Sequence, residues 1–456
     1  MSLEERLKTL KEAEEYRHEF EANLCPTLEL DRNRPFTFIS VGGGELGDLA
    51  VTAAKRQLGG ICGGVATVAF DVYEGFPAQD AADHTRVFNM MDGNELEKSI
   101  KEFVPDPSQP HAIYLEVEKA DTLRVCRLGV KEGYRVMSTP YGPLICMDRY
   151  LTKLMFDKLK VPRVDWRYAR SQREIEEVAR DFNLPVIVKP VMTSSGHGTT
   201  IVKDVSQLED VYEHALRHAR GRGDEVIVER YLPQLATVGT EVTQIAVRHF
   251  DENKKIVTSV APPVEHKRPG ATFHESWLPA NISDRAKQTC QECARRIAEY
   301  IGGLGVFALE LFVVEDVVYN NEVANRPHDT GMITRWMLNM DEGAMMLFST
   351  IGLPITPFDL KLSRSGYGVA HVVLAPNLAD EGRHRVKRFD ANRIRTYITK
   401  KGYDGDVWYF GKPDAYSGRR MGLAVGFDSN VGAARKIAED IAHLAEESIE
   451  IDNALG

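Results

Sequence analysis

Residues 305–332 of this 456-residue chain constrain its fold more than any other stretch. Two runs of apolar, β-branched and aromatic residues flank Glu315-Asp316, a pattern that predicts a β-hairpin. Each run carries one acid, Glu310 and Glu322, at a position where a buried strand should be apolar. An ionised carboxylate in such a setting is costly unless it is paired or binds a cation. The two acids are therefore the first candidates for a functional site.

The register of this hairpin decides whether the two acids meet, because strand side chains alternate between faces. A two-residue loop sets Glu310 opposite Asn321 and places Glu322 on the other face. A three-residue loop, 315–317, sets Glu310 opposite Glu322 with Cβ atoms about 5 Å apart. Two carboxylates at that spacing suit Mg²⁺, which takes one or two protein acids and completes its shell with phosphate oxygens and water. The alternative is a hairpin face open to solvent.

The bulk properties bound the class of protein. The length allows about three domains with large cores. A formal net charge of −10 and the lack of a long basic block argue against a nucleic-acid or lipid-surface partner. No charged-then-apolar leader and no membrane-length apolar run stand in the sequence. Of the six cysteines, Cys290 and Cys293 share a helical pattern and are expected in a core, and the scattered thiols predict a cytoplasmic protein.

The chain is expected to divide into four parts. An N-terminal extension that includes an exposed helix covers 1–34, and a Rossmann-like domain with a parallel sheet covers 35–148. A central domain covers 149–355, with a lid at about 162–230. A small mixed domain covers 356–456. The fold class is therefore α/β in the first domain and α+β in the rest.

A glycine turn opens the first of these domains. A predicted strand at 36–41 runs into Gly-Gly-Gly-Glu-Leu-Gly at 42–47 and then a helix, a geometry that presents backbone N–H groups to an anion. With Asp71 at the end of the next strand, the segment also matches a dinucleotide fingerprint. A nicotinamide-dependent dehydrogenase is thus a rival hypothesis, although many turns need such glycines only for close packing.

Further candidate residues stand at the ends of predicted elements. Glu116 follows a strand, where open α/β sheets place ligands, although a solvated loop acid is the alternative. Arg149 opens a helix. Lys189 ends a strand that leads into a loop of hydroxyls and glycines, 193–199. Such a loop can lay N–H donors over a polyphosphate, although an ordinary hairpin turn is the alternative. Its strand–loop–strand order differs from that of a Walker loop.

Two more groups of residues complete the set. A strand at 225–229 leads to a hinge that could hold an adenine through backbone groups, with Glu241 as a partner for ribose hydroxyls. Near the end of the chain, Lys412, Arg419 and Arg420 lie close in sequence, and their convergence would suit a phosphate. The alternative is a set of solvated side chains.

The order of these parts resembles the ATP-grasp superfamily. Within it, the chain resembles the formate-dependent phosphoribosylglycinamide formyltransferase family over nearly all of 36–442. The most specific segments are Gly-Glu-Leu-Gly at 44–47, Val-Lys-Pro-Val-Met at 188–192, Glu-Ser-Trp at 275–277, Arg-Pro-His-Asp-Thr-Gly-Met at 326–332, Phe-Gly-Lys-Pro at 410–413 and Arg-Arg at 419–420. This resemblance is far more specific than a glycine fingerprint, so it disfavours the dehydrogenase.

The resemblance implies three groups of site residues. For ATP they are Arg149, Lys189, Ser194, Ser195, Gly196, His197, Gly198, Thr199, Glu229 and Glu241. For Mg²⁺ they are Glu310 and Glu322. For the phosphoribosyl amine they are Glu45, Leu46, Glu116, Asp329, Lys412, Arg419 and Arg420. Lys189, Asp329, Glu310 and Glu322 are implied as the catalytic residues.

The resemblance also implies a reaction. ATP phosphorylates formate to formyl phosphate, which the amine of glycinamide ribonucleotide captures in purine biosynthesis. It implies a homodimer as well. His197 departs from the family, which has lysine there, and the segment from Glu229 to Glu241 is longer. These departures keep open a divergent ATP-grasp ligase or carboxylase that joins another small acid to a phosphoribosyl or related amine. A non-catalytic nucleotide-binding regulator is disfavoured, because Lys189 and both metal acids are present.

Overall fold

The computed structural model describes residues 2–24, 30–58, 64–117, 119–193, 196–208, 210–219, 224–268, 273–378 and 382–454. Ser194 and Ser195, two of the predicted ATP-site residues, lie outside these ranges.

The helices are α1 (Leu3–Ala22), α2 (Glu45–Gln57), α3 (Gly93–Phe103), α4 (Thr122–Glu132), α5 (Gly142–Met147), α6 (Arg149–Leu159), α7 (Gln172–Phe182), α8 (Val211–His218), α9 (Asp284–Ile301), α10 (Thr334–Met337), α11 (Glu342–Thr350), α12 (Ala391–Lys401) and α13 (Val431–Glu447), with 3₁₀ turns η1 (Val205–Leu208), η2 (Pro233–Ala236) and η3 (Asp329–Ile333). The strands are β1 (Phe36–Val41), β2 (Val65–Asp71), β3 (His84–Val87), β4 (His111–Leu115), β5 (Trp166–Ala169), β6 (Val186–Pro190), β7 (Thr200–Val202), β8 (Val226–Arg230), β9 (Gly239–Phe250), β10 (Ile256–Val260), β11 (Val264–Lys267), β12 (Glu275–Leu278), β13 (Gly305–Val314), β14 (Val317–Ala324), β15 (Tyr367–Leu374), β16 (His384–Phe389), β17 (Gly405–Tyr409), β18 (Asp414–Ala415), β19 (Arg420–Asp428) and β20 (Ile449–Ala454).

The N-terminal unit is built on a four-stranded parallel sheet in the order β3-β2-β1-β4, which confirms the predicted Rossmann-like fold. Side chains of β1 alternate between its two faces. Phe36 and Phe38 pack in the core that includes α2 and α11, whereas Ile39 and Val41 pack in the core that includes α3 and α4. An apolar strand covered on both sides is typical of a parallel sheet.

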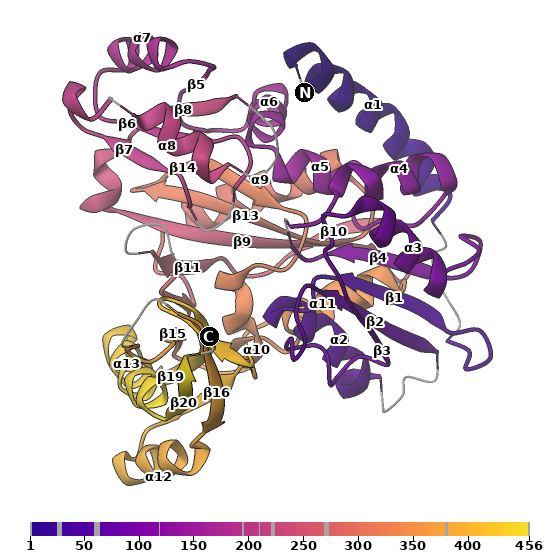
Figure 1. The fold of residues 1–456 in the computed structure, drawn as a ribbon, viewed down its shortest axis with the longest axis vertical. Helices are drawn as coiled ribbons and strands as arrows, with labels where there is room; N and C mark the ends of the chain where they lie inside the picture. Colours follow the sequence, from indigo (N-terminus) through magenta and orange to yellow (C-terminus); the bar gives the residue numbers. More distant parts are fainter. Residues whose placement is uncertain are drawn as a thin grey trace.

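The central sheet has nine strands in the order β14-β13-β9-β11-β12-β15-β19-β17, with β10 paired to β9. Strands β15, β17 and β19 come from the predicted C-terminal domain, and they continue the sheet through the pairing of β12 with β15 (Figure 1). The predicted boundary between 149–355 and 356–456 therefore crosses one continuous hydrogen-bonded sheet. Strands β16, β18 and β20 form a separate three-stranded sheet.

The predicted lid is a small unit of its own. Its sheet has the order β5-β8-β6-β7, and α7 and α8 contribute to its separate hydrophobic core. Figure 1 shows this unit at the upper left, above the β13–β14 edge of the central sheet. Lys189 lies on β6 and faces that edge, so the lid and the acid hairpin meet.

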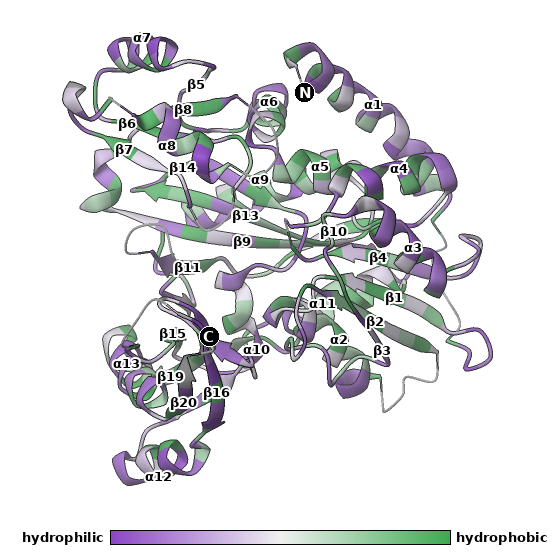
Figure 2. Ribbon diagram, in the orientation of Figure 1, coloured by the Kyte–Doolittle hydropathy of each residue, from purple (hydrophilic) through white to green (hydrophobic). Residues whose placement is uncertain are grey.

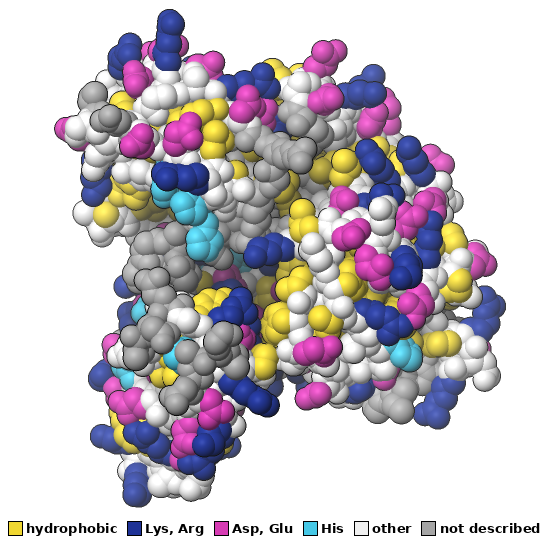
Figure 3. Space-filling model, in the orientation of Figure 1, with side chains coloured by type: hydrophobic (Ala, Val, Ile, Leu, Met, Phe, Trp, Pro, Cys, Tyr) yellow, Lys and Arg dark blue, Asp and Glu magenta, His cyan; other side chains and the backbone are white. Residues whose placement is uncertain are grey.

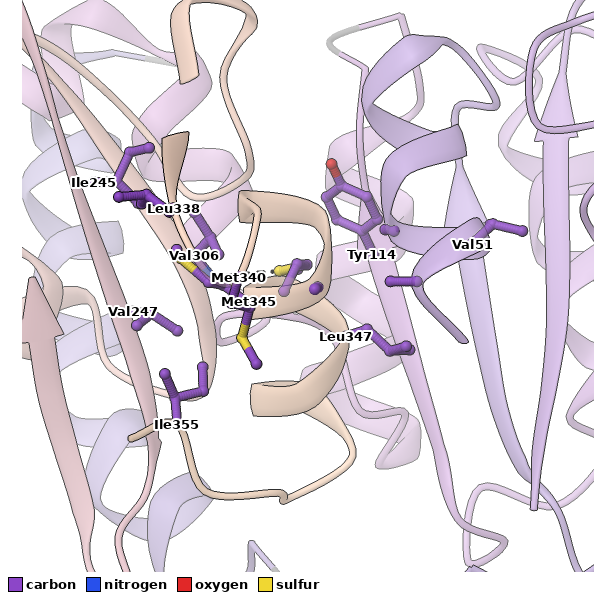
Figure 4. Packing of buried hydrophobic residues seen from close by; sticks show 14 of the residues in the cluster. Val51, Tyr114, Ile245, Val247, Val306, Leu338, Met340, Met345, Leu347 and Ile355 are labelled. Carbon is purple, nitrogen blue, oxygen red and sulfur yellow. Dashed lines mark hydrogen bonds between the residues drawn. The ribbon is translucent and has the colours of Figure 1, made fainter. Parts of the chain in front are cut away.

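Helix α11 joins the cores of the N-terminal unit and the central sheet. Figure 4 shows Leu347 of this helix between Val306 of β13 and Val51 of α2. The packing is close, because a Cβ atom added at Gly343 would lie 2.5 Å from the Leu49 backbone. The glycine turn and the acid hairpin are thereby fixed relative to each other.

The N-terminal helix α1 is not fully exposed, so that prediction is partly wrong. Leu10 and Ala13 are buried in a core shared with α6 and α9, and Glu21 pairs with Arg248 of β9 at 2.7 Å. Most of α1 is hydrophilic, whereas β9 and β13 are largely hydrophobic (Figure 2). Leu10, Ala13 and the partly buried Tyr16 form too narrow an apolar stripe for the sequence pattern to signal burial.

Arg6 ties α1 to the base of the lid. The side chain is 3 % exposed and donates to Asp148 at 3.1 Å and to Glu225 at 2.5 Å. Asp148 caps α6, which begins at Arg149, and Glu225 directly precedes β8 of the lid. One buried guanidinium thus links α1 with α6 and with β8, two of the segments that carry predicted ATP-site residues.

We expect Arg6→Ala to lower the free energy of unfolding by about 3 kcal/mol, because buried Asp148 loses its counter-charge and Glu225 keeps only Arg170 as a cationic partner. Urea unfolding measures this change. Lys8→Ala is the matched control: Lys8 is on the same helix in an ion pair whose lysine side chain is 74 % exposed, so its loss should cost no more than about 0.5 kcal/mol. Equal effects of the two substitutions would contradict the role of Arg6.

Two further observations concern helices. Cys290 and Cys293 are buried on α9 in the core shared with α6, which confirms their predicted place. Within the part of the chain that the structure describes, none of the helices has the length and apolar character needed to cross a bilayer.

Candidate active site

In the acid hairpin β13–β14, Glu310 and Glu322 lie opposite each other, but neither of the two predicted loops explains this pairing. The loop has two residues, because Val314 pairs with Val317, but the register shifts by one between Glu310 and Leu311. Glu310 therefore pairs directly with Glu322. A β-bulge at Asn321, and not a longer loop, sets the acid pair.

The bulge also turns Asn321 toward two lysines. Its side-chain oxygen accepts a hydrogen bond from Lys189 Nζ at 3.0 Å, and its backbone carbonyl accepts one from Lys153 Nζ at 2.9 Å. Bulges often re-aim side chains next to active sites. Here the bulge fixes the position of Lys189 relative to the acid pair.

Glu229 lies behind Lys189. Its carboxylate is 1 % exposed and contacts Lys153 at 2.6 Å and Lys189 at 2.7 Å. Burial opposes the charge on Glu229, but the two ammonium groups outweigh it and lower its pKa to about 2. Glu229 therefore holds Lys189 in place instead of facing the cavity.

Both acids of the hairpin are paired with cationic or hydrogen-bonding groups. Arg149 donates to the two oxygens of Glu322 at 2.9 and 3.2 Å. Arg268 Nη2 and His328 Nε2 lie 2.8 and 2.9 Å from Glu310 Oε1. Burial opposes the ionisation of Glu310, yet Arg268 and His328 keep its pKa well below its usual range.

This donor set suits Mg²⁺. The described residues hold no group of three or more His, Cys, Asp or Glu side chains arranged for a metal. Glu310 and Glu322 instead supply two carboxylates on neighbouring strands. Mg²⁺ is commonly held by only one or two protein carboxylates and takes its other ligands from phosphate and water.

One cavity of about 710 Å³ collects most of the predicted site residues. Figure 3 shows the molecule hollowed between the lid, the N-terminal unit and the C-terminal unit, with charged side chains at the hollow. The predicted residues that line the cavity are Glu45, Leu46, Glu116, Arg149, Lys189, Gly196, Thr199, Glu241, Glu310, Glu322, Asp329, Lys412 and Arg420. Those described but not lining it are His197, Gly198, Glu229 and Arg419.

Acids and cations alternate at the end of the cavity opposite the lid. Arg420 donates to Asp329 at 2.7 Å and lies 3.5 Å from Glu45, which contacts Lys412 Nζ at 3.0 Å. Burial opposes the charges on the acids, but the cations lower the pKa of Glu45 to about 2 and shift the pKa of Asp329 downward. Both acids are therefore carboxylates at neutral pH.

Arg419 turns away from this group. Its guanidinium pairs with Asp414 and lies over the rings of Tyr73 and Tyr416 at 5.3 and 5.1 Å. The predicted convergence of three cations thus involves two of them, Lys412 and Arg420. Successive residues of an extended segment point in opposite directions, which explains the difference.

Comparison with known proteins identifies the family. A model of the ATP-grasp domain matches residues 154–342. The chain is 35 % identical over 407 residues to the formate-dependent phosphoribosylglycinamide formyltransferase of Syntrophotalea carbinolica, covering 88 % of this chain and 94 % of that protein. For the protein of the same name from Pyrococcus horikoshii the identity is 36 % over 413 residues, covering 89 % and 90 %. The chain belongs to the formate-dependent phosphoribosylglycinamide formyltransferase family.

Solved structures share the fold. An N5-carboxyaminoimidazole ribonucleotide synthetase in complex with ADP superposes with a TM-score of 0.74 at 20 % identity, over 93 % of this chain and 100 % of that one. Glycinamide-RNase-transformylase T from Mycobacterium tuberculosis gives a TM-score of 0.67 at 23 % identity, over 89 % and 99 %. The predicted ATP-grasp fold is confirmed.

The glycine turn of this formyltransferase family member serves the site through Glu116. A Cβ atom at Gly42 would lie 2.3 Å from the Glu116 carboxylate, so glycine is needed for its approach. Asp71, the acid that completes the dinucleotide fingerprint, accepts hydrogen bonds from the backbone N–H groups of Gly43 and Val72. The fingerprint is therefore explained by the structure of the turn itself.

Sequence reasoning missed several residues of the site. Lys153 could have been found, because it stands four residues after Arg149 on one helix and so on the same face. Asn321 gave no signal, since a bulge depends on pairing and not on local pattern. Arg268 follows the short strand β11 and lies 2.8 Å from Glu310, a contact between distant segments. His328 belonged to a recognised motif but had no assigned role.

Burial makes the ionised form of the Glu241 side chain unfavourable. Burial raises its pKa to about 7; Arg268 opposes this shift and Glu310 adds to it. The pKa of Glu241 is higher in the folded protein, about 7, than in the unfolded chain, 4.5. Its contribution to the free energy of unfolding is therefore most favourable below pH 4.5 and is lost as the pH rises through about 7. A charged group kept at such a cost is typical of a binding site.

We therefore expect Glu241→Gln to raise stability above pH about 7 by about 1–2 kcal/mol, a range that allows for the exposed part of the side chain. The same substitution should weaken nucleotide binding about tenfold, since an amide replaces a charged acceptor. Urea unfolding across pH and nucleotide titration measure the two effects. Below the unfolded pKa the difference in stability should vanish. A loss of stability above pH about 7 would contradict the interpretation.

Proposed function

We propose that this protein formylates glycinamide ribonucleotide, using ATP and formate, in purine biosynthesis. The observation that carries the proposal is the single cavity in which Lys189 and the acid pair lie at one end and Lys412, Arg420 and Asp329 at the other. That arrangement suits a reaction in which a phosphoryl group and an amine meet between two anchored phosphates. The relatives named above, similar over nearly their full length, support the same reaction.

The lid end of the cavity would bind ATP. Lys189 and Arg149 carry positive charge toward the phosphates, and Gly196 and Thr199 lie on the loop that would cover them. Glu310 and Glu322 would hold Mg²⁺, which neutralises charge on the transferring phosphoryl group. Glu241 would accept hydrogen bonds from ribose hydroxyls.

The chemistry then proceeds in two transfers. A carboxylate oxygen of formate attacks the terminal phosphorus of ATP, the bond between that phosphorus and the bridging oxygen breaks, and ADP leaves. The amine nitrogen then attacks the formyl carbon, the carbon–oxygen bond to phosphate breaks, and the amine gives up one proton. A closed cavity is needed because water would otherwise hydrolyse the acyl phosphate.

The far end of the cavity would orient the amine substrate. Lys412 and Arg420 would bind its phosphate, since a guanidinium can contact two phosphate oxygens at once. Asp329, whose lowered pKa keeps it charged, would accept a hydrogen bond from the amine and direct its lone pair. The homodimer and the cytoplasmic location stay predictions.

Glu322→Gln is expected to abolish ATP turnover while leaving the fold intact, because the loss of one charge empties the pair that would hold the metal. Acid-dependent release of ADP measures turnover, and binding of Mn²⁺ followed by paramagnetic resonance measures the metal site directly. Near wild-type values in both measurements would remove Glu322 from the metal site.

Arg420→Ala should raise the KM for the phosphoribosyl amine by tens-fold or more, because one buried contact with a phosphate is worth about 2–4 kcal/mol. The KM for ATP should change little, since Arg420 lies at the other end of the cavity. Arg419→Ala is the matched control, because this neighbour pairs with Asp414 outside the cavity. A rise confined to the KM for ATP would show that Arg420 contacts ATP and not the phosphoribosyl amine.

A further inference from the structure

Glu342 is a buried acid that the proposed reaction does not use. It is the first residue of α11 and is 0 % exposed, and it is not among the residues that line the main cavity. A carboxyl group buried in this way is costly unless its polar atoms have partners. What Glu342 contacts therefore indicates what it does.

The carboxyl group of Glu342 lies against the backbone of the 326–332 loop. Its Oε2 atom accepts a hydrogen bond from the backbone N–H of His328 at 2.9 Å. A Cβ atom added at Gly331 would lie 2.3 Å from the same oxygen, so glycine is needed there for the loop to fit around the carboxyl group. These two contacts stand on either side of Asp329, which is proposed to orient the amine.

Helix α11 also contacts the element that carries the other acid at this end of the cavity. Gly343 packs against α2, where an added Cβ atom would lie 2.5 Å from the Leu49 backbone. Glu45 begins α2. Arg420 lies 2.7 Å from Asp329 and 3.5 Å from Glu45, so it bridges the two acids. Two consecutive residues of α11 thus contact the loop that carries Asp329 and the helix that carries Glu45.

We propose that Glu342 is a positioning residue for the amine substrate: by holding the loop, it sets the place of Asp329 relative to Glu45. The proposal rests on the proposed function and adds to it a residue outside the cavity. Glu342 touches no reacting atom and acts through Asp329. A shift of about 1 Å in an orienting group can cost about 100-fold in rate, so an anchor behind the loop can control binding and turnover.

The carboxyl group of Glu342 is uncharged at neutral pH. Burial raises its pKa well above the usual range, although the hydrogen bond from His328 opposes this shift. Its Oε1 atom has no hydrogen-bond partner among the described residues, a position that an ionised carboxylate would make costly. An uncharged acid can accept the N–H of His328 without placing a second buried negative charge near Asp329.

Three substitutions of Glu342 test the proposal. Glu342→Leu removes the acceptor, and Glu342→Asp draws the carboxyl group back from the loop by one methylene group. Each should raise the Kd and the KM for glycinamide ribonucleotide about tenfold or more, because the His328 N–H loses its partner. Glu342→Gln should stay within about twofold of the wild type, since an amide oxygen accepts the same hydrogen bond and no charge is lost. The Kd for ATP should stay within about twofold throughout, because the β13–β14 register sets the acid pair.

Asp341→Ala is the matched control, because Asp341 stabilises the same helix end without a contact to the loop. It accepts a hydrogen bond from the Ala344 N–H at 2.8 Å and pairs with Arg56, at the opposite end of α2 from Glu45. Asp341→Ala should lower the urea midpoint, since α11 loses its cap, and leave the Kd for glycinamide ribonucleotide within about twofold. A Kd that rises with the loss of stability in this control as it does in Glu342→Leu would overturn the positioning role.

Binding of glycinamide ribonucleotide is measured by calorimetry without formate, so the result does not depend on formylation. Unchanged binding in Glu342→Leu and Glu342→Asp would overturn the proposal, as would equal losses in Glu342→Gln and Glu342→Leu. If Glu342→Leu does not fold, the comparison of Glu342→Asp with Glu342→Gln decides alone. A wild type that binds glycinamide ribonucleotide but releases no ADP with formate would overturn formylation and leave the binding test of Glu342 in force. A wild type that does not bind it would overturn both.

Discussion

The site depends on the cost of placing two partly buried carboxylates, Glu310 and Glu322, side by side. Two like charges on neighbouring strands repel each other and lose hydration, and each must be offset by a nearby cation. Arg149 of α6 offsets Glu322, and Arg268 after β11 offsets Glu310, whose carboxylate also contacts His328 after β14. These groups come from three separate segments. The acid pair can therefore be stable only when the lid base, the central sheet and the 326–332 loop are all assembled.

Much of the fold was predictable because its signals are local. Arg149 opens a helix, Cys290 and Cys293 lie on one helix, and Lys189 lies one residue before the end of its strand, all close to expectation. The hairpin register was not predictable in the same way. The bulge at Asn321 is stabilised by two lysines distant in the sequence, so no pattern within the hairpin reports it. Arg6 and Glu225, 219 positions apart, give no local signal either.

In the candidate site, the sequence predicted which residues lie near one another but not which way each side chain points. Most of the residues implied by the family resemblance line one cavity, because motifs at the ends of strands and in loops fix where a segment lies. It did not fix where each side chain points. Glu229 faces Lys153 and Lys189 from behind, and Arg419 faces Asp414. These directions follow from strand alternation and buried ion pairs, which only the assembled structure determines.

The internal ion pairs also give a physical route by which the proposed ligands could each find a counter-charge already in the cavity. In the proposed function, each ligand would exchange an existing partner for an equivalent one: a cation at Glu310 would replace Arg268, and a phosphate at Arg420 would replace Glu45 or Asp329. The groups released in this way remain buried, so they must find partners on the ligands themselves. Arg268 lies 2.8 Å from Glu310 and 3.7 Å from Asp329, so a metal ion at Glu310 would leave it paired with Asp329 alone. Under that proposal, binding the metal would leave Arg268 as a counter-charge for the anion that the next step forms.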